Sequence, residues 1–178
     1  MPRPPDSRRR KGQRRRVDLD SSVLLGASRR LLVAGAALGY YDVYRSSWLI
    51  SEFVRKRTEW IANRAMKEGC TPAELRQRQR VSRERVDAVV AEMARIFRLV
   101  DYTEAPPADI SWLTDTTDRP VIQTALVARA AVLITENSRD FPIGETRNAV
   151  QITDTRLFLG ALYAAFPGAE SDIRLLLQ

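Results

Sequence analysis

Apolar residues along the chain fall into short runs and into longer, helically spaced stripes. The short runs predict five strands, at residues 15–20, 42–45, 98–102, 131–135 and 149–153. The longer segments predict six helices, at residues 22–38, 46–67, 71–80, 82–97, 114–130 and 154–166. Ser46 or Ser47 is expected to cap the second of these helices. Strands that alternate with helices predict an α/β fold, a three-layer α/β/α sandwich around a central, mostly parallel sheet.

Oxygen-bearing side chains occur where predicted strands end. Asp20 ends the first strand, and Asn137 follows the fourth, within the stretch VLITENSRDFP (132–142). In parallel sheets ligands bind beyond the carboxyl ends of the strands, so we expect both side chains on one rim. The turn after the fourth strand is therefore either a surface loop or a source of ligands.

Further carboxylates lie near the same expected rim. They are Glu52 early in an apolar helix, Asp115 and Asp118 at a helix start, and Asp140 in the turn. Converging carboxylates repel one another, and a bound Mg²⁺ or Mn²⁺ usually neutralises this repulsion. The alternative is that each acid only caps or decorates its own helix.

The chain contains no histidine and a single cysteine, Cys70. The lack of histidine excludes a Ser-His-Asp or Cys-His centre and any His-ligated zinc site. A lone cysteine cannot form an internal disulfide, which favours a reducing, cytoplasmic location. The apolar run within residues 27–39 is too short to span a bilayer, so no membrane partner is expected.

Positive charge is concentrated at the N-terminus. The chain has 29 basic and 22 acidic side chains, and eight of the basic and one of the acidic lie in residues 1–16, so the remainder has 21 of each. We therefore expect a disordered basic arm over residues 1–16 and a single neutral domain over residues 17–178. The arm either contacts a polyanion, or is a solvated tail, or consists of residues that precede the native start of the protein.

Four stretches in this order resemble the PIN-domain ribonuclease superfamily, and VapC-like toxins in particular. They are DSSVLL (20–25), WLISEFVR (48–55), DTTDRPVIQTAL (115–126) and VLITENSRDF (132–141). The resemblance covers roughly residues 17–160. Each motif is weak alone, but their order, spacing and placement on the predicted elements make the match fairly specific. The resemblance implies a PIN-like fold and a metal-dependent endoribonuclease that cleaves RNA, as the toxin of a toxin–antitoxin pair.

The resemblance also implies roles for individual residues. Asp20, Glu52 and Asp118 would be the catalytic acids, and the ligands of Mg²⁺ or Mn²⁺ would be Asp20, Glu52, Asp118, Asp115, Asn137 and Asp140. Many members of the family carry an aspartate where this chain has Asn137. Asparagine adds no negative charge, so we expect weaker metal binding and a larger part for Asp140.

RNA must also be held, and the basic segment between residues 63 and 86 is the candidate. The residues expected to bind RNA are Arg64, Arg76, Arg80, Arg83 and, in the turn, Arg139. Phosphate contacts would make binding salt-dependent, whereas the alternative is a solvated helical hairpin. Protein partners in this interpretation are an antitoxin and a second copy of the chain.

Two other functions compete with the nuclease. VDLDSSV resembles the nucleophile motif of haloacid-dehalogenase-type phosphatases, in which Asp18 would be the nucleophile and Asp20 the acid. The later signatures of that family are absent from the sequence. The third candidate is a catalytically weak nucleic-acid-binding module with the same fold, impaired by Asn137.

Overall fold

The computed structural model describes residues 14–178. Within them, one six-stranded sheet has the order β3-β2-β1-β4-β6-β5, parallel throughout except for the β5–β6 pair. The strands are β1 Arg15–Leu19, β2 Tyr41–Arg45, β3 Arg98–Leu99, β4 Val132–Ile134, β5 Thr146–Arg147 and β6 Val150–Thr153. The same residues form seven α-helices, α1 Ser21–Leu25, α2 Arg29–Ala37, α3 Ser47–Lys67, α4 Pro72–Ile96, α5 Arg119–Val127, α6 Thr155–Ala165 and α7 Ala169–Leu176, and two 3₁₀ helices, η1 Tyr102–Glu104 and η2 Thr116–Asp118. The expected α/β class with a mostly parallel sheet is confirmed.

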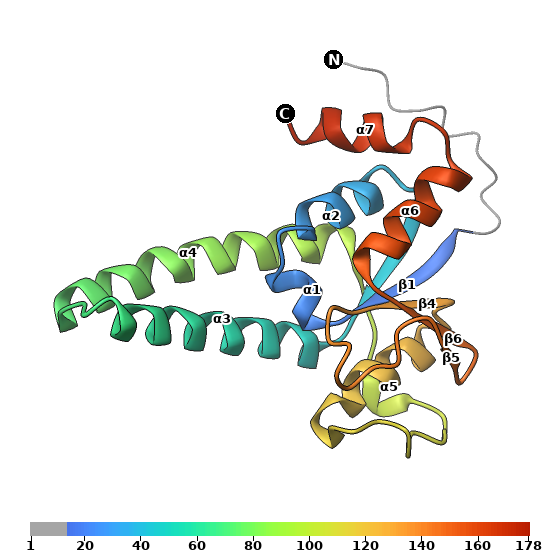
Figure 1. Cartoon of the computed structure of the whole chain (residues 1–178), viewed down its shortest axis with the longest axis horizontal. Helices are drawn as coiled ribbons and strands as arrows, with labels where there is room; N and C mark the ends of the chain where they lie inside the picture. The colour runs from blue at the N-terminus through green and yellow to red at the C-terminus, as the bar shows by residue number, and fades with distance from the viewer. Residues whose placement is uncertain (1–13) are drawn as a thin grey trace.

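Side chains of the sheet alternate between two apolar clusters. Val17 and Leu19 pack in one cluster with residues of α1, α2, α3, α4, α6 and α7. Leu133 packs in the other cluster, with residues of α5. Asp18 is in register with Leu133, and paired residues of parallel strands share a face. Asp18 therefore points toward α5, and helices cover both faces of the sheet (Figure 1).

The long helices α3 and α4 form a hairpin that projects from the sheet (Figure 1). Ser46 or Ser47 was expected to cap α3, and the cap is Ser46. Its hydroxyl accepts a hydrogen bond from the backbone N–H of Leu49 (3.3 Å). Thr71 and Glu74 form a capping box at the start of α4. These caps define where the two helices of the hairpin begin.

Several expected elements were wrong in their extent. The helix expected over residues 22–38 is divided into α1 and α2, because the chain makes a tight turn at Gly26, whose N–H donates to Val23. The two helices expected over residues 71–80 and 82–97 are the single helix α4, since no glycine or proline interrupts the chain between them. The strand pattern did not indicate β5, and the C-terminal helix α7 was also missed.

Most of the expected basic arm lies outside the described residues, namely residues 1–13. Arg15 and Arg16 belong to β1, in agreement with the strand expected over residues 15–20. In the part of the chain that the structure describes, no helix is long and apolar enough to cross a membrane.

Candidate active site at the carboxyl edge of the sheet

The carboxyl edge of the sheet is held together around Asp20, which directly follows β1 and is 2% exposed. Its Oδ2 accepts hydrogen bonds from the hydroxyls of Ser22 (2.6 Å) and Thr135 (2.9 Å). Its backbone N–H donates to the carbonyl of Ile134 (2.9 Å). The Thr135 hydroxyl in turn accepts from the backbone N–H of Asn137 (2.9 Å). The expectation that Asp20 and Asn137 share one rim is therefore confirmed.

Glu52 reaches this rim from the second turn of α3 and is 8% exposed. Lys56, one turn later, places its ammonium 3.0 Å from Glu52 Oε1 and donates to the hydroxyl of Ser21 (3.1 Å). The other oxygen, Oε2, is buried and accepts no hydrogen bond from any residue between 14 and 178. Leaving a carboxylate oxygen buried without a donor is costly, so this atom is a natural ligand for a cation.

Asp118 approaches the rim from the start of α5 and is 5% exposed. Burial and the nearby carboxylates of Asp20 and Glu52 raise its pKa to about 6, although Lys56 acts in the opposite direction. This repulsion requires that the three acids lie within electrostatic reach of one another. The structure therefore brings together the three acids expected to be catalytic, each from a different element.

Asn137 links two of the carboxylates. Its side-chain nitrogen donates to Asp118 Oδ2 (3.2 Å) and to Asp140 Oδ2 (2.8 Å). The amide thus serves here as a hydrogen-bond donor between two acids, whereas a metal ligand would present its oxygen. Asp140 is half-buried and belongs to the same rim, as expected.

Asp115 is exposed and caps η2, accepting hydrogen bonds from the backbone N–H and the hydroxyl of Thr117 (both 2.8 Å). These hydrogen bonds lower its pKa, and the positive charges of Arg139 and Lys56 contribute. For Asp115 this capping role agrees with the alternative that each acid only caps its own helix. Asp115 is therefore adjacent to the buried acids rather than one of them.

The donor set suits a hard divalent cation. The possible ligand atoms of the buried acids and of Asn137 are carboxylate and amide oxygens, which Mg²⁺ and Mn²⁺ prefer. Glu52 Oε2 provides a buried oxygen without a partner among residues 14–178. Across those same residues, no three acidic or cysteine side chains already have the spacing of a metal site. The residues therefore fit the ion by the chemistry of their side chains.

The arginines expected to bind RNA do not form one cluster. Arg64, Arg76, Arg80 and Arg83 are exposed along the hairpin, and Arg139 is exposed in the turn after β4. Arg64 pairs with Glu68 (2.7 Å). RNA binding by these residues stays a prediction.

Asp18 is the most deeply buried acid in the sheet, at 1% exposed. Neither of its carboxylate oxygens has a hydrogen-bond partner within residues 14–178. Burial raises its pKa well above the usual range, the backbone of Leu19 acts in the opposite direction, and the charge of Asp20 makes a smaller contribution that raises it further. A phosphatase nucleophile must reach its substrate, so this burial argues against the phosphatase interpretation.

Lys56 is the site residue that sequence reasoning missed. Its ammonium is close enough to Asp118 and Asp115 to influence both pKa values, in addition to its contact with Glu52. The spacing of four residues between Glu52 and Lys56 is a sequence signal for a helical ion pair. It could have indicated that one acid of the set carries its own counter-ion.

Comparison with protein-family models, with curated proteins and with solved structures finds no match for this chain. The functional argument therefore rests on the residues of the rim and on their geometry.

Proposed function

We propose that the chain is a metal-dependent endoribonuclease with a PIN-like fold, which hydrolyses phosphodiester bonds of RNA. The observation that carries the proposal is the convergence of Asp20, Glu52 and Asp118 at the carboxyl edge of a mostly parallel sheet. The order of sequence motifs that resembles PIN domains supports the same conclusion. A pKa of about 6 leaves Asp118 mostly ionised at neutral pH, as a cation ligand must be.

The residues of the rim have distinct roles in this proposal. Asp20, Glu52 and Asp118 would hold Mg²⁺ or Mn²⁺, and Asp140 would add a further oxygen. The chemistry that such an ion supplies is polarisation of a phosphate and activation of water. Ser22 and Thr135 orient Asp20 through their hydrogen bonds.

Two cationic side chains lie near this rim. Lys56 offsets part of the negative charge of the acids, and with Glu52 engaged as a metal ligand its ammonium would be free to contact a substrate phosphate. Arg139 is exposed in the turn beside Asp115. Either could stabilise the charge that develops on the phosphate oxygens.

The biological setting that the motifs favour is a toxin, neutralised by an antitoxin protein. This part of the proposal rests on the resemblance of the sequence motifs to VapC-like proteins. The rim of exposed and half-buried polar residues gives a partner an accessible surface next to the acids. Binding of the wild-type chain by a protein encoded beside it, with loss of RNA cleavage, is the outcome expected for a toxin.

The direct test of the proposed activity is cleavage of single-stranded RNA by the purified chain. We expect cleavage in Mn²⁺ or Mg²⁺ and none in EDTA, restored when the metal ion is added back. RNA binding without cleavage in either metal would contradict the enzyme and favour the nucleic-acid-binding module. Release of phosphate from small phosphomonoesters, with no RNA cleavage, would instead revive the phosphatase interpretation.

A further inference from the structure

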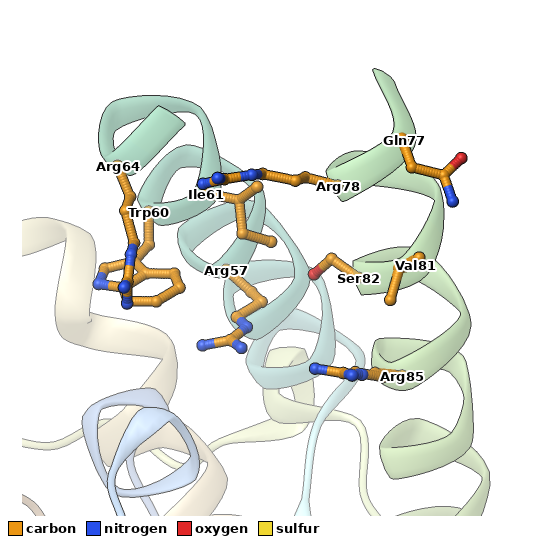
Figure 2. Close-up of a pocket in the computed structure, with 9 residues that line it drawn as sticks. All are labelled: Arg57, Trp60, Ile61, Arg64, Gln77, Arg78, Val81, Ser82 and Arg85. Atoms are coloured by element: carbon orange, nitrogen blue, oxygen red, sulfur yellow. The ribbon is translucent and has the colours of Figure 1, made fainter. Parts of the chain in front are cut away.

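An open hollow of about 450 Å³ lies between α3 and α4 (Figure 2). Four of its lining residues are arginines, Arg57 and Arg64 from α3 and Arg78 and Arg85 from α4, and a tryptophan, Trp60, lies among them. We call this surface the arginine hollow. It is separate from the acids of the rim and lies farther along the hairpin.

The charges of the arginine hollow are only partly neutralised. Arg64 and Arg78 both pair with Glu68 near the tip of the hairpin. Arg57 and Arg85 have no carboxylate partner within residues 14–178. Figure 2 shows Arg85 reaching from α4 toward α3, where Arg57 and Trp60 lie. Uncompensated positive charge gathered in a concave surface attracts a polyanion.

Trp60 is a half-exposed aromatic residue, and two of these charges lie over its ring. It is 48% exposed, and the guanidinium carbons of Arg57 and Arg64 lie 4.6 Å and 5.3 Å from its ring centroid. These cation–π contacts hold the indole and two cations next to one another. Proteins that bind single-stranded nucleic acid combine the same two elements, an aromatic platform for a base and cations for the phosphates.

We propose that the arginine hollow binds single-stranded RNA, with an unpaired base stacked on Trp60 in place of the Arg64 guanidinium and phosphates on Arg57 and Arg85. The choice of RNA among polyanions rests on the proposed function. Trp60 follows Glu52 by eight residues on α3, which is about 12 Å along the helix axis. One strand could therefore extend from the rim to the hollow, and the hollow would hold RNA beside the site of cleavage.

The composition of the hollow favours nucleic acid over a protein segment as the occupant. An apolar helix or strand would leave Arg57 and Arg85 covered and unpaired, which is costly. Phosphates would neutralise both, and every base has a face that can stack. An acidic peptide would use the cations, but it would gain little from the indole of Trp60.

The test is the affinity of the full chain for a fluorescent single-stranded oligouridylate of roughly a dozen nucleotides. Fluorescence anisotropy in EDTA measures binding without cleavage. We expect Trp60→Ala to weaken binding about tenfold and Trp60→Phe, which keeps a stacking ring, to weaken it only about threefold. Because stacking needs an unpaired base, affinity for a duplex of the same length should be unchanged by Trp60→Ala.

The charges are tested by two double variants with equal loss of charge. Arg57→Ala with Arg85→Ala should weaken binding about tenfold and reduce the slope of log affinity against log salt by about 1.4, as expected for two single-strand phosphate contacts. Arg95→Ala with Arg174→Ala removes the same charge from exposed positions of α4 and α7 that do not line the hollow. This control should weaken binding less than about threefold.

Two results would overturn the inference. One is an unchanged affinity of Trp60→Ala for the single strand, and the other is an equal effect of the two double variants. Failure of the proposed nuclease is a separate result, because the binding assay contains no metal ion and measures no cleavage. If the chain binds RNA through Trp60 but never cleaves it, the proposed RNA-binding site would stand and the proposed nuclease activity would be wrong.

Discussion

Asp20→Asn is expected to reduce the rate of metal-dependent RNA cleavage by at least about a thousandfold, which corresponds to roughly 4 kcal/mol of transition-state stabilisation. Asp20 is buried at the end of β1 and is fixed by the hydroxyls of Ser22 and Thr135. Asparagine keeps the size of the side chain and one acceptor oxygen but removes its charge. The measurement is the single-turnover cleavage rate in saturating Mn²⁺.

The control for Asp20→Asn is Asp101→Asn, the same chemical change at an exposed acid that caps η1. It should cleave RNA at close to the wild-type rate. RNA affinity in EDTA should not fall in Asp20→Asn, because removing a negative charge does not oppose phosphate binding. If Asp20→Asn retained more than a tenth of the wild-type rate while folded, Asp20 would not be part of the active site.

Asp18→Asn is expected to stabilise the protein at pH 8 by about 2 kcal/mol. Asp18 is buried without hydrogen-bond partners among residues 14–178, and folding raises its pKa well above the unfolded value of about 3.9. The folded state therefore binds this proton more tightly than the unfolded state does. The associated stability is present below pH 4 and is lost as the pH rises toward the folded pKa. Asparagine avoids that loss.

The measurement for Asp18→Asn is the free energy of unfolding in urea at pH 4 and pH 8, without added metal ions. The gain over wild type should be present at pH 8 and small at pH 4. Asp87→Asn, at an exposed position of α4, should change stability by less than about 0.5 kcal/mol at either pH. A destabilised Asp18→Asn at pH 8 would show that the Asp18 carboxylate forms stabilising contacts that the structure lacks.

The parts of the fold that could be predicted were those with strong local signals. The continuous apolar run at residues 131–135 became the buried strand β4, and the polar Ser46 before an apolar helix became its cap. The parallel arrangement followed from the alternation of strands and helices. Helix boundaries were less predictable, because Gly26 divided one expected helix, whereas α4 continued through residue 81 where a break was expected.

The sequence could predict which acids belong to the candidate site, but not which side chains contact them. Strand ends and helix starts indicated Asp20, Glu52 and Asp118, since sheet topology determines which ends meet. The donor role of Asn137 toward Asp118 and Asp140 depends on how the amide is turned. That orientation depends on the side chains that surround the amide in the folded protein. The position of Lys56 between the acids likewise depends on tertiary packing. A single sequence contains little information on either.

The most direct test of the central claim is a calorimetric titration of the chain with Mn²⁺ at pH 7.5. The account predicts a single Mn²⁺ bound per chain by wild type, and an affinity weakened by at least about tenfold in Glu52→Gln and in Asp118→Asn. The exposed Asp101→Asn should bind Mn²⁺ as wild type does. Equal Mn²⁺ affinity in all four proteins, or no binding by wild type at millimolar Mn²⁺, would contradict a metal site built from these acids.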